Sequence, residues 1–244
     1  MIKYSVIIPV YNEEASLLFL FASIKNTMDK LDLDSEIIFV NDGSQDNSYQ
    51  ILRDIDTHGA RLIIVDLEKH YGKSAALQAG FDNAEGEVII TMDGDLQNDP
   101  EDIPKLLDKM KEGLDVVCGW RYQRNDPWLK IWSAKIACAV RKIIVRENIH
   151  DVGCAFRVFN KKCFKNVHLS GGLHRFFTLI MLKLGYRIGE VKIRHHSRKF
   201  GKTKYNVWNR LFEVTKDLIS IMIFDIGVLM EHKHAYEIRE IIKK

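Results

Sequence analysis

The segment TMDGDLQNDP, residues 91 to 100, places acidic and amide side chains at alternate positions directly after an apolar run. Alternate positions on an extended segment point the same way, so Asp93, Asp95 and Gln97 are expected to converge on one cation. All-oxygen ligands suit Mg²⁺ or Mn²⁺, and Mg²⁺ commonly takes one or two carboxylates together with substrate phosphates. A metal held there would stabilise a diphosphate as a leaving group. The alternative is an acidic loop that caps the helix expected at Pro100.

Two further polar segments, PVYNEE and NDGS, follow apolar runs in the same way. Asp42 can accept hydrogen bonds from a ribose or a base, and Asn12 and Glu13 can do the same. The alternative is again capping, because Asn, Asp and Ser are common cap and turn residues. Lys73 opens a predicted helix, where a cation beside the helix N-terminus makes a phosphate site, although a solvent-exposed lysine is the alternative.

Basic residues concentrate in two later stretches. Residues 120 to 146 carry seven Lys or Arg with four interleaved aromatic residues and one acid, and residues 192 to 205 contain no acid. Arginine favours bidentate phosphate contacts, so these stretches predict an anionic acceptor. The alternatives are a solvated face and a nucleic-acid binder, but no RNA-module signature is present and the acidic pocket would repel a nucleic-acid backbone. No nucleic-acid partner is therefore expected.

The elements that must position these motifs are apolar, β-branched runs alternating with helical segments. The runs lie at 4–10, 36–40, 61–67, 87–92 and 114–120. This alternation predicts a parallel sheet covered on both faces, in which ligands bind beyond the carboxyl ends of the strands. The three polar motifs should therefore cluster in space.

The chain has 244 residues, of which 46% are hydrophobic and 28% charged, with a net charge of +3. This is the composition of a globular protein, and the net charge is too small to indicate a partner. No signal peptide is expected, because the first apolar run is short and stops at Pro9. No membrane-crossing segment is expected either, because the apolar stretch 218–230 contains Asp225 and is shorter than the roughly 18 residues that a span needs. Residues 207–223 have the spacing of an amphipathic helix, and a second, more charged helix is expected at 230–243. The first helix either packs on the domain, lies in the membrane surface or binds a membrane subunit.

The motifs taken together resemble a known family. VIIPVYNEE, VNDGS, GKSAALQAG and MDGDLQNDPEDI resemble the nucleotide-sugar-binding half of the family 2 glycosyltransferases, which have a GT-A fold. GWRYQRNDPWLKIWSAK, DVGCAFRVF, GLHRFF and RHHSRKFGKTKYN are similar to the dolichyl- or polyprenyl-phosphate sugar synthase branch. The resemblance spans about residues 3 to 220, and the later motifs are the more specific ones.

The resemblance implies roles for individual residues. The nucleotide-sugar site would comprise Pro9, Tyr11, Asn12, Glu13, Asp42, Lys73, Asp93, Gly94 and Asp95, with the metal on Asp93, Asp95 and Gln97. The acceptor phosphate would be held by Arg121, Ser133, Lys135, Arg198 and Lys204, and Asp95, Asp151, Arg121 and Arg198 would take part in catalysis. The family often has a basic residue directly after Ser133, where this chain has Ala134, and Lys135 is expected to substitute.

Asp151, in DVGCAFR, is the acid of the second half. It could serve as general base toward an alcohol, but a phosphate acceptor is already ionised at neutral pH and needs no strong base. We therefore expect Asp151 to shape the site by orienting Arg157 or the donor sugar, the alternative being a loop residue that pairs with a nearby arginine. His174 and Arg175 are expected to contact the leaving diphosphate.

These inferences define one hypothesis. Residues 1–205 form a GT-A-like α/β domain, with a nucleotide-sugar half at 1–118 and an acceptor half at 119–205, and 206–244 form an amphipathic helical extension. The protein transfers a sugar from a GDP- or UDP-linked donor to a polyprenyl or dolichyl phosphate, with Mg²⁺ or Mn²⁺ and with inversion, while peripheral on the cytoplasmic face of the membrane. The alternatives are transfer to a polysaccharide or glycolipid hydroxyl, and a non-catalytic sugar-nucleotide-binding subunit of a membrane complex.

Overall fold

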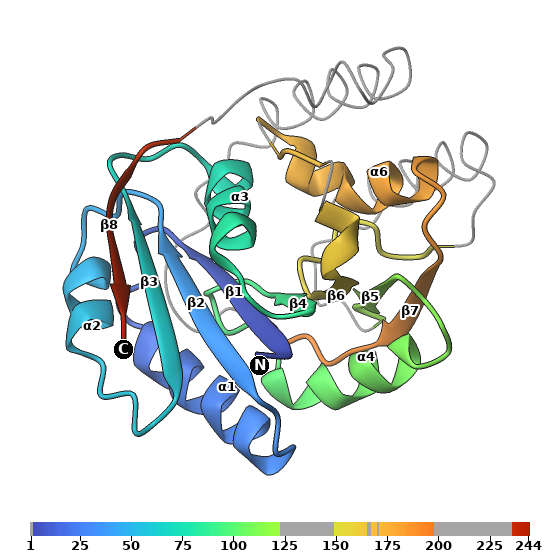
Figure 1. The fold of residues 1–244 in the computed structure, drawn as a ribbon, viewed down its shortest axis with the longest axis horizontal. Helices are drawn as coiled ribbons and strands as arrows, with labels where there is room; N and C mark the ends of the chain where they lie inside the picture. Colours follow the sequence, from blue (N-terminus) through green and yellow to red (C-terminus); the bar gives the residue numbers. More distant parts are fainter. Residues whose placement is uncertain (1, 123–148, 165–166, 170, 198–235) are drawn as a thin grey trace.

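The structure of the protein is a computed structural model that describes residues 2–122, 149–164, 167–169, 171–197 and 236–244. Within these residues, eight strands form one sheet in the order β7-β5-β6-β4-β1-β2-β3-β8 (Figure 1). The amphipathic helix expected at 207–223 lies outside the described residues, as do Ser133, Lys135, Arg198 and Lys204.

Four of the predicted strands form the centre of the sheet. They are β1 (Tyr4–Val10), β2 (Ser35–Asn41), β3 (Arg61–Leu67) and β4 (Val88–Thr91). β1 pairs in parallel with β2 and β4, and β2 pairs in parallel with β3. Neighbouring residues of β1 face opposite sides, since Ile7 belongs to one apolar core while Val6 and Ile8 belong to the other. Burial on both faces explains why these strands have continuous apolar sequences.

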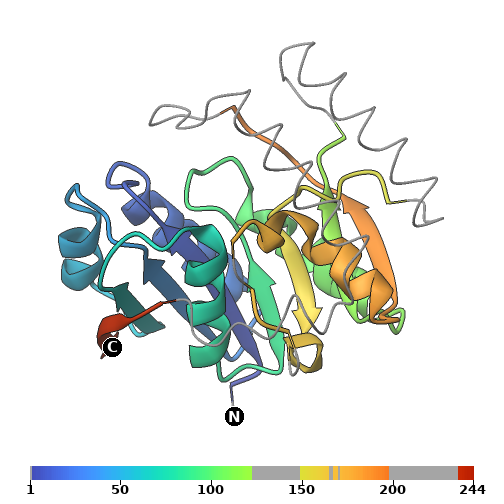
Figure 2. The same cartoon turned by 90° about the horizontal axis from the view of Figure 1, so that it is seen from above.

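Helices cover both faces, as predicted. One face packs on α1 (Leu17–Lys30), α2 (Ser48–Asp54) and α4 (Ile103–Met110). The other packs on α3 (Lys73–Asn83), α6 (Phe177–Lys183) and the short 3-10 helices η2 (Lys161–Phe164) and η3 (Leu173–Phe176). Figures 1 and 2 show α3 and α6 on the side of the sheet opposite to α1 and α4. A further 3-10 helix, η1 (Pro100–Asp102), precedes α4 and confirms the helix start expected at Pro100.

The second half of the chain extends the same sheet with β5 (Val116–Trp120), β6 (Arg157–Asn160) and β7 (Ile188–Lys192). β6 is antiparallel to both of its neighbours, β4 and β5, whereas β5 and β7 are parallel. Of these three strands the sequence predicted only β5. The sheet is therefore mixed, although most of its strand pairs are parallel.

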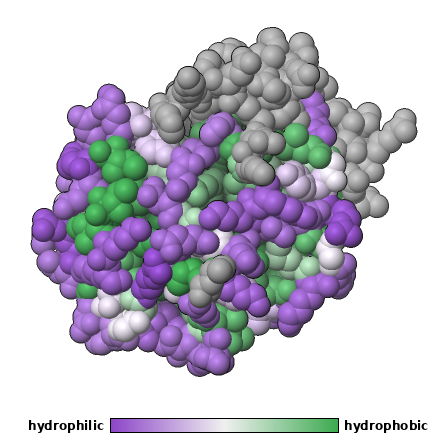
Figure 3. Space-filling view, viewed as in Figure 1, coloured by the Kyte–Doolittle hydropathy of each residue, from purple (hydrophilic) through white to green (hydrophobic). Residues whose placement is uncertain are grey.

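The end of the chain corrects one prediction. Residues Ile238–Lys243 form a strand, β8, that pairs antiparallel with β3, so the helix expected at 230–243 is wrong over this range. Ile238, Ile241 and Ile242 have helical spacing, but the open edge of β3 offers backbone groups that a strand can pair. Ile238 and Ile241 remain more than a third exposed, and Figure 3 shows a hydrophobic area on the side of the molecule where β3 and β8 lie.

The Arg239 side chain links β8 to β3 and to the residue that follows it, in addition to the backbone hydrogen bonds between the two strands. Its guanidinium lies 3.2 Å from the buried carboxylate of Asp66 and donates to the carbonyl of Glu68 at 2.6 Å.

We predict that Arg239→Ala lowers the free energy of unfolding by about 1 kcal/mol, because both acceptors lose a charged donor. Urea unfolding measures this. The control is Lys243→Ala, whose exposed pair with Glu85 at 3.5 Å should contribute much less, and equal losses in both variants would contradict the assignment.

Candidate active site

The loops after β1, β2 and β4 meet at one end of the sheet, as the sequence predicted. The amide of Asn12 donates to Ser44 Oγ at 3.0 Å, which joins the first two loops. Ser16 Oγ donates to the carbonyl of Gly94 at 2.7 Å, which joins the first and third. A Cβ placed on Gly94 would lie 3.4 Å from the carbonyl oxygen of Pro9 and 3.9 Å from Glu13 Cγ. The motifs PVYNEE, NDGS and DGDLQ therefore form one polar cluster.

Asn12 and Glu13 brace the first loop against the second. Asn12 has a φ of 53°, and its Oδ1 accepts from the amide of Gln45 at 2.7 Å. The amide of Glu13 donates to Ser48 Oγ at 2.9 Å. These bonds join two loops and cap no helix, and the predicted contact of Asn12 with a nucleoside stays a prediction.

Asp42 holds the turn that leads from β3 into α3. Its buried carboxylate accepts from the amides of Tyr71 at 2.7 Å and Gly72 at 3.0 Å, and His70 Nδ1 lies 2.9 Å from its Oδ2. Burial raises the pKa of Asp42, against the opposing effect of these amides and of His70. Gly43 permits the close approach, because a Cβ there would lie 2.4 Å from the His70 amide nitrogen. Asp42 therefore supports the site whether or not it also binds a nucleoside.

Tyr11 and His70 form a stacked pair beside Asp42. Their ring centroids are 3.9 Å apart with an interplanar angle of 22°. His70 was not among the predicted site residues, and its signal in the sequence was its place two residues before GKSAAL. Flat rings of this kind are suited to stacking against a nucleobase.

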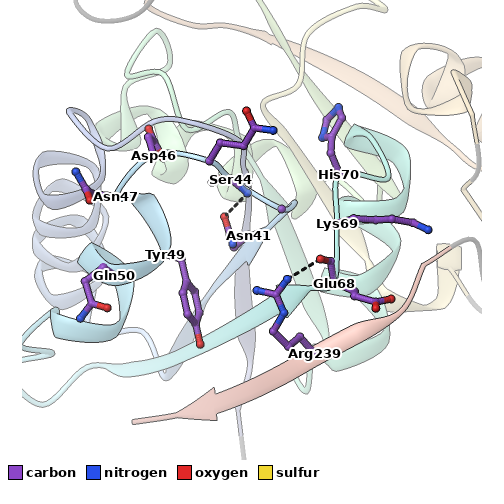
Figure 4. A pocket seen from close by; sticks show the side chains of 12 residues that line it. Asn41, Ser44, Asp46, Asn47, Tyr49, Gln50, Glu68, Lys69, His70 and Arg239 are labelled. Carbon is purple, nitrogen blue, oxygen red and sulfur yellow. Dashed lines mark hydrogen bonds between the residues drawn. The ribbon is translucent and has the colours of Figure 1, made fainter.

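His70 also borders a polar cavity of about 430 Å³ beyond the ends of β2 and β3 (Figure 4). The cavity is lined by residues of the segment 41–50 other than Asp42 and Ser48, by Glu68 and Lys69, and by Arg239 of β8. Figure 4 shows Arg239 hydrogen-bonded to Glu68 on the β8 side of the cavity. None of the predicted site residues that the structure describes lines this cavity, which shares Gly43 and His70 with the cluster around Asp42.

Lys73 and Asp93 form an ion pair between the start of α3 and the end of β4. Burial alone would raise the pKa of Asp93, but the Lys73 ammonium, aided by Arg121, outweighs burial and lowers it. Asp93 is therefore ionised at neutral pH. The solvated lysine weighed as an alternative does not occur, because Lys73 places its charge inside the acidic cluster.

The DGDLQ segment is a turn, so the extended geometry assumed in its prediction is wrong. Leu96 has a φ of 59°, and Asp95 Oδ1 accepts from the amide of Gln97 at 3.2 Å. The Gln97 side chain donates to the carbonyl of His196 at 3.4 Å. The convergence of Asp93, Asp95 and Gln97 on one cation therefore cannot be argued from strand alternation. Asp99 is the cap of η1, since its Oδ1 accepts from the amide of Glu101 at 3.0 Å.

The oxygen ligands that Asp93 and Asp95 offer nevertheless fit a divalent cation. Asp93 is ionised and already faces a cation, Lys73, and Asp95 adds a second carboxylate from the same turn. Two carboxylates completed by substrate phosphates match the coordination that Mg²⁺ prefers. No group of three His, Cys, Asp or Glu side chains with metal-binding geometry occurs within the described ranges. A cation here would depend on the diphosphate for part of its coordination.

Arg121 and Asp151 form the second charged group. Arg121 follows β5, and its Nε and Nη2 donate to the two oxygens of Asp151 at 2.7 and 2.9 Å. Burial alone would lower the pKa of Arg121, but the Asp151 carboxylate outweighs this and raises it. Asp151 therefore orients Arg121, in agreement with the alternative that it pairs with a nearby arginine.

Arg157 is held differently from the prediction. Its guanidinium donates to the carbonyls of Val152 at 2.8 Å and His174 at 3.4 Å, and its buried Nε has no hydrogen-bond partner among the described residues. The expectation that Asp151 orients Arg157 is therefore wrong, because the bidentate bond to Arg121 takes its place. Arg157 links the loop of Val152 to η3.

His174 lies in η3 next to this group, and Ser74 of α3 contacts it. Ser74 Oγ lies 2.8 Å from His174 Nδ1 and accepts from the His174 amide at 3.2 Å. Burial lowers the pKa of His174 well below its usual 6.5, and the positive charges of Lys73, Arg175 and Arg157 lower it further. Ser74 was missed, since a serine in an alanine-rich helix gives no signal of its own. His174 is a neutral imidazole at the edge of the charged cluster.

We predict that an NMR titration finds His174 almost wholly neutral at pH 6.5, where an ordinary histidine is half protonated. Lys73→Met should raise the pKa of His174 by removing one positive charge, although burial should keep it below 6.5. Lys69→Met, on the preceding loop, is the control and should leave the titration unchanged. A midpoint at or above 6.5 in the unmodified protein would contradict the buried environment of His174.

The fold is shared with solved glycosyltransferases. The structure is similar to glucosyl-3-phosphoglycerate synthase from Mycobacterium tuberculosis in complex with Mn²⁺, UDP and glucosyl-3-phosphoglycerate, with a TM-score of 0.67 and 19% identity over 89% of this chain and 77% of that chain. A structure of the same enzyme with Mg²⁺ and UDP aligns equally well, with a TM-score of 0.67. The chain thus has a GT-A-like fold, as predicted.

The sequence comparisons define the class more closely. The profile described as glycosyl transferase family 2 matches residues 5–167, and the chain belongs to this family of glycosyltransferases. It is 37% identical to the dodecaprenyl-phosphate galacturonate synthase of Rhizobium johnstonii over 91% of this chain and 67% of that protein. It is 34% identical to the undecaprenyl-phosphate 4-deoxy-4-formamido-L-arabinose transferase of Aeromonas hydrophila over 89% of this chain and 67% of that protein. In the part of the chain that the structure describes, no helix has the length and apolar character needed to cross a bilayer.

Proposed function

We propose that the protein transfers a sugar from a nucleoside-diphosphate sugar to the phosphate of a polyprenol, with inversion at the anomeric carbon. The observation that carries the proposal is the position of Arg121. Asp151 orients its guanidinium, and the positive charge of Arg121 helps to lower the pKa of Asp93 on the donor side. The printed names of the relatives from Rhizobium johnstonii and Aeromonas hydrophila describe sugar transfer involving polyprenyl phosphates, which supports the same reaction here.

On the donor side, Asp93 and Asp95 would hold Mg²⁺ or Mn²⁺, which would supply positive charge to the departing diphosphate. Lys73 stands against Asp93 and is placed to meet a phosphate oxygen when the donor binds. The stacked rings of Tyr11 and His70 offer a surface for the base. The proposed site for the sugar nucleotide therefore combines two carboxylates, one ammonium group and one aromatic surface.

On the acceptor side, Arg121 would bind the lipid phosphate through the guanidinium nitrogen that does not contact Asp151. A phosphate oxygen attacks the anomeric carbon, the bond from this carbon to the diphosphate oxygen breaks, and the nucleoside diphosphate leaves. The nucleophile is already ionised, so Asp151 need not accept a proton. This is consistent with its bidentate bond to Arg121, which would lower its strength as a base. Catalysis would consist of positioning and charge stabilisation.

The lipid acceptor would be reached from the cytoplasmic face of the membrane, with the protein bound peripherally or to a membrane subunit. Ser133, Lys135, Arg198 and Lys204 would complete the phosphate site, and the helix predicted at 207–223 would contact the membrane surface. The product would be a polyprenyl-phosphate sugar that serves cell-surface glycan assembly or protein glycosylation.

The proposal is tested with purified protein, Mn²⁺, a panel of GDP- and UDP-sugars and a short polyprenyl phosphate. Release of nucleoside diphosphate should require the lipid phosphate with one donor of the panel. Release that a polyprenol without phosphate supports equally would indicate a hydroxyl acceptor. Donor binding without release under any condition would indicate a non-catalytic sugar-nucleotide subunit.

We predict that Asp95→Asn reduces lipid-dependent turnover by about 100-fold or more, because one of the two carboxylates that would carry the metal becomes neutral. The matched control is Asp108→Asn on the exposed face of α4, where Asp108 pairs with Lys111 and turnover should not change. Steady-state rates at saturating Mn²⁺ and at a tenfold lower concentration measure the effect. Turnover of Asp95→Asn within twofold of the unmodified protein would refute the metal assignment.

A further inference from the structure

The loop that presents Asp151 is irregular, yet Asp151 and Val152 are buried. A buried loop needs partners for its backbone amides, since an unpaired buried amide costs about 1–3 kcal/mol. Asp151 itself also needs a fixed position if it is to orient Arg121. The groups that satisfy this loop therefore bear on the acceptor site.

Glu190 of β7 supplies those partners. Its Oε1 accepts from the amide of Asp151 at 2.8 Å, and its Oε2 accepts from the amide of His150 at 2.7 Å. Oε2 also lies 2.9 Å from the imidazole Nδ1 of His150. The Glu190 side chain is only 9% exposed, and its bond to the buried Asp151 is the more shielded one, since the His150 side chain is 49% exposed. One carboxylate thus fixes two successive amides and one ring.

The strand pairing brings Glu190 close to Arg121. Glu190 lies opposite Cys118 in the register of β5 and β7, and Arg121 is the first residue after β5. Trp120 stacks on His150, with centroids 4.2 Å apart and an interplanar angle of 13°. The loop is therefore fixed from β7 by a carboxylate and from β5 by a ring.

We propose that Glu190 is a positioning residue for the acceptor phosphate, acting through Asp151 on Arg121. Glu190 fixes the backbone of Asp151, Asp151 fixes the guanidinium through two hydrogen bonds, and the guanidinium meets the phosphate. This inference rests on the proposed function for the identity of the phosphate. The arrangement of the three side chains is independent of that identity.

A glutamine at position 190 has nearly the same shape but only one acceptor oxygen, and its NH₂ group would face a backbone amide. Glu190→Gln should raise the KM for the lipid phosphate about tenfold, with a smaller change in kcat and no change in the Kd of the nucleoside diphosphate. Glu190→Asp keeps the carboxylate and should recover part of the loss. Glu112→Gln is the control, since Glu112 pairs at the surface with Lys109 and should have no effect.

A double-mutant cycle with Arg121→Ala separates this role from a general loss of folding. If Glu190 acts through Arg121, Glu190→Gln should change the KM for the lipid phosphate by less than twofold in the Arg121→Ala background. Effects that multiply would overturn the proposal, as would equal losses in donor binding and acceptor KM.

A second readout requires no turnover. Phenylglyoxal modifies arginine, and peptide mass spectrometry can follow its reaction with Arg121, whose side chain is 17% exposed in its pair with Asp151. Glu190→Gln should raise the rate of modification at Arg121 severalfold, and Glu112→Gln should not. If the wild-type protein shows no lipid-dependent release of nucleoside diphosphate, the proposed function fails. The rates at which phenylglyoxal modifies Arg121 then decide by themselves whether Glu190 positions Arg121. Equal rates in both variants would refute it.

Discussion

The structure depends on how buried charge is balanced at the carboxyl ends of the central strands. Asp93 lies two residues beyond the end of β4, where it is only partly exposed, and burial by itself would raise its pKa and disfavour the ionised form. Lys73 balances it from the first position of α3, and Asp42 fixes the turn that sets where α3 begins. The loops after β1 and β2 then brace one another around these groups. Charge compensation and loop geometry are thus parts of one arrangement.

In the second half of the chain the charges are reversed, since a carboxylate there balances a cation. Arg121 is a cation whose side chain is mostly shielded from water, and Asp151 compensates it with a bidentate bond. Asp151 in turn lies in a loop whose backbone amides at His150 and Asp151 donate hydrogen bonds to Glu190. The acidic group at Asp93 and the basic group at Arg121 are close enough for the charge of Arg121 to lower the pKa of Asp93. A donor diphosphate and an anionic acceptor could therefore be brought together without placing two uncompensated anions side by side.

Sequence reasoning located the central strands and the polar loops because apolar runs and their polar ends are local features. It could not anticipate the turn at Leu96, since a positive φ at leucine has no sequence signature, and this turn invalidated the alternation argument for the metal ligands. It also missed β8, because Ile238, Ile241 and Ile242 fit a helix until the open edge of β3 is known. Glu190 was missed for the same reason as Ser74: each is a single polar residue whose importance comes from a partner far away in sequence. Local pattern predicts elements, whereas partner choice is decided by tertiary packing.

The pairing of β8 with β3 also bears on the protein's tendency to self-associate. β3, with the sequence RLIIVDL, has five apolar residues out of seven. As an outer strand it would be open to edge-to-edge pairing with other chains. β8 occupies that edge and presents Arg239, Glu240 and Lys243 among its isoleucines, and charged residues on an outer strand discourage such pairing. β8 therefore shields an aggregation-prone strand of the central sheet, and its Arg239 also lines the cavity beside His70.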